Sequence, residues 1–251
     1  MTNETIRNRL MENEIPFTPD LPEKLRIYME LLTEWNAKMD LTAVLEEDET
    51  LDKHFIDSLM ILKTDLAKDV KTMIDVGTGA GFPGLVIALA CPEIKVTLLD
   101  AQMKRLKFLE AVVEQLHVTN VRIVHDRAED GARKPELRER FDLAVARAVA
   151  PLNVLCEYLL PYVRVGGKTI CWKGPALTDE MEQGSKAAVI LGGRVGEKIP
   201  CPIPGRDWEH NLLTVHKVAP TSGKYPRKAG TPKNSPLGTA KDRAKGQGPR
   251  A

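Results

Sequence analysis

The chain has 251 residues, of which 43% are apolar and 28% charged, so it is long enough to bury a full core. It has no apolar run of membrane-spanning length and no signal-peptide pattern, which predicts a cytoplasmic protein without a membrane partner. The four cysteines are scattered, with neither C-x-x-C nor cysteine–histidine spacing. We therefore expect buried thiols, including Cys201, and no metal site.

The net charge of +1 conceals a strong segregation of charge along the chain. Residues 1–60 hold 14 Asp or Glu against 6 Lys or Arg, whereas residues 217–251 hold 9 Lys or Arg against one Asp. A basic C-terminal part rich in proline and glycine indicates contact with a polyanion such as nucleic acid. We expect residues 238–251 to be a disordered tail. Residues 219–237, a basic arm with an aromatic, prolines and Leu237, are expected to dock in part.

The predicted elements fall into a helical segment followed by an alternating one. Over residues 1–65, Asp20 can cap a first helix and a second is predicted over 48–63, together forming a small segment packed on the core. From 66 to 218 strands alternate with helices, and the last two strands are poorly separated by helix. This pattern predicts an α/β fold with a seven-stranded, mostly parallel sheet and an antiparallel edge hairpin. Strands are predicted near 72–76, 95–99, 121–125, 141–146, 167–172, 193–199 and 211–217, and helices near 83–91, 103–117, 151–160 and 178–190.

The most informative stretch is a glycine-dense turn between the first predicted strand and the next helix. It reads Met-Ile-Asp-Val-Gly-Thr-Gly-Ala-Gly-Phe-Pro-Gly over 73–84. Glycines let the backbone approach a ligand closely, and the helix N-terminus offers unpaired N–H groups. Asp100, which ends the next strand, is placed to accept hydrogen bonds from a ribose diol. The stretch therefore predicts a nucleotide-type cofactor site.

Two cofactors compete for this site. The glycines at 79, 81 and 84 form a G-x-G-x-x-G, which with Asp100 is typical of a dinucleotide such as NAD. S-adenosylmethionine sites instead have an acid two residues before a G-x-G-x-G, and Asp75 with the glycines at 77, 79 and 81 fits that version in full. We favour S-adenosylmethionine. An NAD-dependent oxidoreductase remains the alternative, although no second substrate domain follows residue 217, and a non-catalytic rRNA- or ribosome-binding protein is a third.

Further candidates follow other predicted strands, because ligands of open α/β sheets bind at the carboxyl ends of the strands. Ala128-Glu129 is expected to hold the adenine, and Arg147 to contact cofactor or substrate. His54 and Asp57 lie three residues apart on a helix, where buried hydrogen bonding is favoured over catalysis. For the basic pair at 104 and 105, a functional role and a solvated face stay equally open. The full set expected to contact the cofactor is Asp75, Gly77, Gly79, Gly81, Phe82, Asp100, Ala101, Gln102, Ala128, Glu129 and Arg147.

A series of motifs in this order resembles the bacterial small-subunit rRNA guanine-N7 methyltransferase family, also called the glucose-inhibited division B family. The resemblance covers residues about 5 to 237. One departure is Asp40-Leu-Thr, where many members have Asn-Leu-Thr. We expect little effect, since both side chains accept a capping bond. The motifs are Glu34-Trp-Asn with Asp40-Leu-Thr, His54-Phe-Ile-Asp57-Ser-Leu, the glycine turn, Lys104-Arg105 with Phe108-Leu109, Arg127-Ala-Glu129, Arg147-Ala148 and Lys224-Tyr-Pro-Arg227.

The resemblance implies a class I, Rossmann-like methyltransferase that uses S-adenosylmethionine to methylate N7 of guanine 527 in the 530 loop of 16S rRNA. The RNA partner would be 16S rRNA or a small-subunit assembly, and a monomer is favoured. Guanine N7 has a lone pair and no proton, so catalysis needs positioning and no general base, with Arg147 the single candidate for a catalytic role. The arm is expected to grip phosphates and stack a base through Lys224, Tyr225, Arg227, Lys228 and Lys233.

Overall fold

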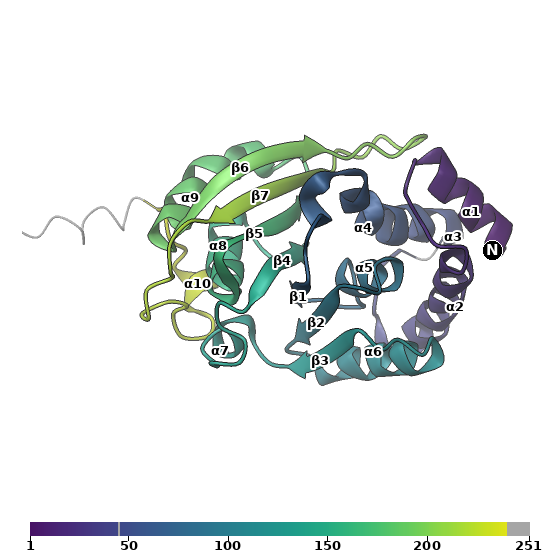
Figure 1. Cartoon of the computed structure of the whole chain (residues 1–251), viewed down its shortest axis with the longest axis horizontal. Helices are drawn as coiled ribbons and strands as arrows, with labels where there is room; N and C mark the ends of the chain where they lie inside the picture. The colour runs from purple at the N-terminus through teal and green to yellow at the C-terminus, as the bar shows by residue number, and fades with distance from the viewer. Residues whose placement is uncertain (45, 240–251) are drawn as a thin grey trace, which may run out of the picture.

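The computed structural model describes residues 1–44 and 46–239, so most of the predicted tail at 238–251 lies outside the described residues. A seven-stranded sheet has the order β3-β2-β1-β4-β5-β7-β6, with β1 to β5 parallel and β7 antiparallel to both neighbours (Figure 1). The predicted fold class is confirmed. The strands are β1 (Thr72–Val76), β2 (Lys95–Asp100), β3 (Val121–His125), β4 (Phe141–Arg147), β5 (Val163–Lys173), β6 (Gly193–Pro200) and β7 (Asn211–Lys217).

The sheet is buried on both faces, as its near-continuous apolar strands require. Alternate residues of β4 enter different cores: Leu143 and Val145 face one hydrophobic cluster, and Ala144 and Ala146 face the other. The first cluster joins the sheet to α1, α2, α5 and α6, and the second joins it to α8 and α9. The longer helices are α1 (Asn3–Glu12), α2 (Leu21–Met39), α5 (Gly84–Ala90), α6 (Met103–Gln115), α8 (Leu152–Leu159) and α9 (Leu177–Ile190).

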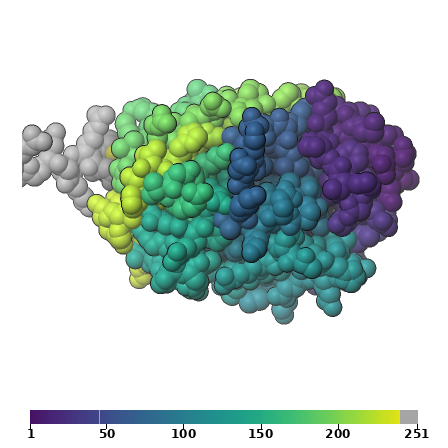
Figure 2. All heavy atoms as spheres, viewed as in Figure 1, coloured from purple at the N-terminus to yellow at the C-terminus, as the bar shows by residue number. Residues whose placement is uncertain are grey.

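Eight short helical elements lie between the longer helices and strands of the described residues or follow the last strand. In Figure 2 the start of the chain, in purple, and the C-terminal segment, in yellow, lie at opposite ends of the molecule. No helix among residues 1–44 and 46–239 is long and apolar enough to cross a membrane. The short elements are α3 (Glu47–Thr50), η1 (Leu51–Ile56), α4 (Asp57–Leu59), η2 (Met60–Lys63), η3 (Asp65–Ala67), α7 (Ala128–Gly131), η4 (Leu160–Tyr162) and α10 (Thr231–Asn234).

Two predicted elements differ from the observed ones. The single helix expected over 48–63 is a series of turns, in which a π-helical turn over 51–56 separates α3 from α4. Hydrophobic spacing does not reveal one widened turn, and such turns are frequent at functional sites. Strand β5 begins four residues earlier than expected, because Gly166, with φ +87°, lies within an irregular part of the strand rather than ending it.

Asp40 ends α2 in the left-handed conformation, with φ +49°. Its side chain accepts no hydrogen bond among the described residues, so the capping bond that we expected from it is wrong. Asn and Asp are the non-glycine residues that adopt this conformation most readily. Asn36 provides the side-chain contacts instead, because its Oδ1 accepts the N–H groups of Leu41 and Thr42 at 2.6 and 2.8 Å.

Tyr28 of α2 ties the N-terminal helices to the glycine turn. Its hydroxyl donates to the carbonyl of Ala80 at 2.5 Å, and its ring stacks on Phe82 with 5.5 Å between centroids. A Cβ at Gly81 would lie 2.1 Å from the Tyr28 hydroxyl oxygen. Gly81 is therefore required for the close approach of this side chain.

We expect Tyr28→Phe to lower the free energy of unfolding by about 1–3 kcal/mol, because the buried Ala80 carbonyl loses its partner. Tyr225→Phe is the matched control, since Tyr225 is also buried and its hydroxyl makes no hydrogen bond among the described residues. Urea denaturation of both variants measures the difference. Equal stability of the two would show that the Tyr28 hydroxyl contributes nothing.

Candidate functional site

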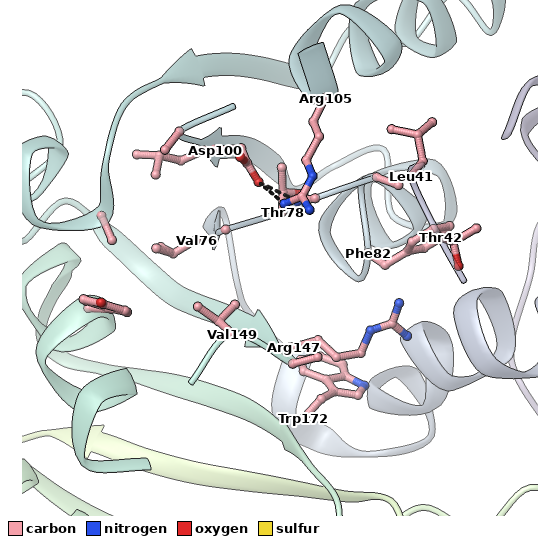
Figure 3. A pocket seen from close by; sticks show the side chains of 18 of the residues that line it. Leu41, Thr42, Val76, Thr78, Phe82, Asp100, Arg105, Arg147, Val149 and Trp172 are labelled. Carbon is pink, nitrogen blue, oxygen red and sulfur yellow. Dashed lines mark hydrogen bonds and ion pairs between the residues drawn. The ribbon is translucent and has the colours of Figure 1, made fainter. Parts of the chain in front are cut away.

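A cavity of about 730 Å³ lies at the carboxyl ends of β1, β2 and β4, where the strand order reverses between β1 and β4. Figure 3 shows Asp100 and Arg105 on one side of it and Arg147 and Trp172 on another. Three of the residues predicted to contact the cofactor, Asp75, Gly81 and Gln102, do not line the cavity. Those that do are Gly77, Gly79, Phe82, Asp100, Ala101, Ala128, Glu129 and Arg147.

Asp75 lies beneath the glycine turn rather than in the cavity. Its Oδ2 accepts the Thr78 hydroxyl and the Gly84 N–H, both at 2.8 Å, so the carboxylate fixes both ends of the turn. Its Oδ1 is buried without a hydrogen-bond partner among the described residues. Burial raises the pKa of Asp75 to about 6, against the lowering effect of the two hydrogen bonds.

Asp100 links the turn to the cavity. Its Oδ2 accepts the Gly79 N–H at 2.9 Å and its Oδ1 accepts the Gln102 N–H at 2.8 Å. Gln102 thus supports Asp100 through its backbone, and its predicted contact with the cofactor stays a prediction. Each carboxylate oxygen keeps a second lone pair for a ligand hydroxyl.

Gly79 leaves room for a ligand next to Asp100. It has φ +61°, lines the cavity, and a Cβ built on it meets nothing within 4 Å. A side chain at this position would enter the open space of the cavity. The open cradle at Gly79 and the free acceptor capacity of Asp100 fit a nucleoside with a ribose diol, as the sequence predicts.

The adenine of the cofactor is expected near Glu129, and part of the C-terminal arm also lies at this place. Glu129 is only 5% exposed, and its Oε1 accepts the N–H of Gly230 at 2.7 Å. Gly230 and Lys233 both line the cavity. No sequence pattern predicts the Gly230 contact, because 101 residues separate the two partners.

Arg147 connects β4 to the N-terminal helices. One guanidinium nitrogen, Nη1, donates to the Lys53 carbonyl at 2.8 Å and to Asp57 Oδ2 at 2.9 Å. The guanidinium carbon lies 5.2 Å from the centre of the Phe82 ring, a cation–π contact. Asp57 Oδ1 pairs with Nδ1 of His210 at 2.8 Å, so the buried carboxylate joins two residues that line the cavity.

His54 is held as a neutral side chain. Its Nδ1 lies 3.4 Å from Arg147 Nη2, and its Nε2 lies 2.7 Å from the Thr42 hydroxyl. Because a guanidinium only donates, Nδ1 must accept, which assigns the proton to Nε2. Burial, followed by the charge of Arg147, lowers the pKa of His54 to about 4.

The arm differs most from its prediction. Tyr225 is 8% exposed within the second hydrophobic cluster, so its ring offers no stacking surface. The Arg227 guanidinium is paired with the buried carboxylate of Glu157 rather than presented to RNA, with Nη2 at 2.7 Å from Oε2. Lys224, Lys228 and Lys233 are exposed, and Lys233 also lines the cavity. Tyr and Arg have the expected chemistry of an RNA contact, but docking of the arm buries Tyr225 and engages Arg227 in an ion pair.

Several cavity-lining residues were not anticipated from the sequence. They come from distant segments that only the fold brings together, and no local motif marks them. Of the basic pair, Arg105 lines the cavity, 3.6 Å from Asp100, whereas Lys104 is exposed outside it. The additional lining residues with polar side chains or aromatic rings include Lys53, Tyr158, Trp172, Lys173 and His210.

The raised pKa of Asp75 predicts a pH dependence of stability. Its pKa is 3.8 in the reference state and about 6 in the fold, so the folded protein retains a proton that the unfolded chain releases. The stability that this proton contributes is complete below the unfolded pKa and is lost as the pH rises through the folded pKa. The free energy of unfolding of the cofactor-free protein, relative to Asp75→Asn, should fall by about 3 kcal/mol between about pH 4 and about pH 7. Urea denaturation at both pH values measures this difference. If the free energy of unfolding differs between the protein and Asp75→Asn by the same amount at about pH 4 and about pH 7, the prediction is wrong.

The proteins that this chain resembles in sequence are methyltransferases, which agrees with a nucleoside site in the cavity. The family model described as rRNA small subunit methyltransferase G matches residues 21–201. The protein named Ribosomal RNA small subunit methyltransferase G from Alkaliphilus metalliredigens (strain QYMF) is 48% identical over 215 residues, covering 86% of this chain and 90% of that protein. The protein of the same name from Clostridium perfringens (strain 13 / Type A) is 48% identical over 221 residues, covering 88% and 92%.

A solved structure confirms the fold class. The crystal structure of M. jannaschii TYW2 in complex with AdoMet superposes with a TM-score of 0.52 at 11% identity, and the match covers 70% of this chain and 80% of that one. At this identity the likeness concerns the fold alone. On the strength of the family model and the two relatives, the chain belongs to the rRNA small subunit methyltransferase G family.

Proposed function

We propose that this methyltransferase uses S-adenosylmethionine to methylate N7 of guanine 527 in the 530 loop of 16S rRNA. The cofactor supplies an electrophilic methyl group carried on a sulfonium. The lone pair of N7 forms a bond to the methyl carbon while the carbon–sulfur bond breaks, which leaves S-adenosylhomocysteine and a cationic N7-methylguanine. No proton moves in this step.

The observation that carries the choice of N7 is the state of the two proton acceptors in direct contact with Arg147, His54 and Asp57. His54 directs its lone pair at the guanidinium, and both oxygens of Asp57 are paired. None of these groups is free to take a proton from a substrate. A ring nitrogen with its own lone pair suits such a site, because positioning and electrostatics are then sufficient.

Arg147 is the residue that we assign to the guanine. It lies across the cavity from Asp100 (Figure 3), and its contacts with Asp57 and Lys53 hold it in one orientation. A guanidinium can donate to guanine O6, which leaves N7 free to react. Arg147 would thus orient the base.

The target guanine must be unpaired or drawn out of its stack, since the major groove of A-form RNA is too deep and narrow for an active site. The exposed Lys224, Lys228 and Lys233 are the remaining proposed phosphate contacts of the arm. Of these three lysines, Lys233 is the best-supported contact. It lines the cavity, so it can reach RNA that occupies the site.

The test of the function is methyl transfer to defined RNA. Purified protein, S-adenosylmethionine and small subunits or 16S rRNA lacking the modification should yield N7-methylguanosine in the 530 loop, detected by mass spectrometry of nuclease fragments. A methyl group on another atom or nucleotide would overturn the assignment. Cofactor binding without any transfer would favour a non-catalytic RNA-binding protein.

We expect Gly79→Asn to weaken binding of S-adenosylhomocysteine at least tenfold, because the new side chain occupies the open space beside Asp100. Asn is chosen because it tolerates positive φ. Gly205→Asn is the matched control: Gly205 has φ +77°, its Cβ also meets nothing within 4 Å, and it does not line the cavity. Calorimetry should show normal affinity in the control. An equal loss of affinity in both variants would contradict the prediction, because it would point to backbone strain rather than to a filled cavity.

The single-turnover rate of methyl transfer should stay flat between about pH 6.5 and about pH 8.5. His54, with a pKa of about 4, is neutral throughout this range, and attack by N7 releases no proton. Quenched-flow assays with saturating cofactor measure the rate. A rise centred near neutrality that disappears in His54→Gln would show that a general base participates.

A further inference from the structure

The C-terminal arm, residues 219–237, is built into the protein. Tyr225 and Leu237 are buried in the second hydrophobic cluster. The Arg138 guanidinium donates to the carbonyls of Thr221 and Tyr225 at 2.8 and 2.9 Å. The contacts of Thr221 and Tyr225 fix the first part of the arm and Leu237 fixes its end, and all three residues lie outside the cavity.

The next anchor is an ion pair with Glu157 of α8. Glu157 is completely buried, and its Oε1 accepts the backbone N–H of Arg227 at 2.7 Å. The Arg227 side chain adds Nε at 3.0 Å from Oε1 and Nη2 at 2.7 Å from Oε2. One carboxylate therefore fixes both the backbone and the side chain of Arg227, with the two-point geometry that makes such pairs strong.

Three residues after Arg227 the arm reaches the cavity. The N–H of Thr231 bonds to the carbonyl of Lys228 at 2.9 Å, and Gly230 has φ +84°, so a tight turn connects the anchor to the cavity wall. In this turn the Gly230 N–H bonds to Glu129 Oε1. The other oxygen, Oε2, makes no hydrogen bond to any residue that the structure describes. It remains available to an N–H or O–H donor in the cavity.

We propose that Glu157 is a positioning residue for cofactor binding: it holds Arg227, and through the turn the Gly230 N–H, so that the Glu129 carboxylate is held ready for the adenosine end of the cofactor. This rests on the proposed function, in which S-adenosylmethionine occupies the cavity. The arm then serves the cofactor site directly, in addition to any RNA contact of its exposed lysines.

The proposal is tested by calorimetric titration of S-adenosylhomocysteine into the full chain and four variants: Glu129→Gln, Glu157→Gln, the double variant and Leu10→Ala. Each single glutamine variant should bind roughly tenfold more weakly. The double variant should be no more than about twofold weaker than the worse single one, because both changes remove the same Glu129–Gly230 arrangement. Leu10→Ala, in the core of α1, should lose stability and keep its affinity.

One further measurement and one further variant separate positioning from a general loss of stability. The Gly230 amide proton should shift upfield in both Glu129→Gln and Glu157→Gln, measured by nuclear magnetic resonance. Arg227→Lys, which retains the charge and loses the two-point contact, serves if Glu157→Gln does not fold, and should weaken binding several-fold.

Three results would overturn the proposal: normal affinity in Glu157→Gln or Arg227→Lys, an additive loss of about 100-fold in the double variant, or an affinity that simply follows stability in Leu10→Ala. Failure of the proposed function looks different. In that case the unmodified protein itself does not bind S-adenosylhomocysteine.

Discussion

The site depends on two buried carboxylates that hold a glycine turn in shape. Asp75 accepts one N–H and one hydroxyl from the turn, and Asp100 accepts the Gly79 N–H. Backbone donors can stabilise a buried carboxylate, and the carboxylates in turn leave little freedom for the turn. The turn is thereby set before a ligand arrives, with open space at Gly79 and free lone pairs on Asp100. This arrangement fixes the part of the cavity that lies beside Gly79 and Asp100.

Three distant parts of the chain complete the cavity around this turn. Tyr28 supports it from α2, and Asp57 connects Arg147 on β4 with His210 beside β7. The arm closes the third side through Gly230. In the proposed function, the sheet and the arm supply the cofactor end, and the N-terminal helices hold the arginine that faces it.

The sequence predicted the sheet well because each strand reads as a short apolar run and each helix as a periodic one. It also placed Asp100, Glu129 and Arg147 at strand ends, where the topology brings them together. It failed where tertiary contacts decide the outcome. Tyr225 and Arg227 look like an RNA-binding pair, but Tyr225 is buried in the second hydrophobic cluster and Arg227 pairs with Glu157, 70 residues away. The role of Gly81 likewise depends on Tyr28, which local spacing does not reveal.

The most direct test of this account is a crystal structure of the protein with S-adenosylhomocysteine bound. We predict the ligand in the cavity, with its ribose hydroxyls on Asp100, its adenine beside Ala128 and Glu129, and the Gly230 contact retained. The sulfur should lie on the side of the cavity that faces Arg147. A ligand bound elsewhere, or one that displaces the arm from Glu129, would contradict the account.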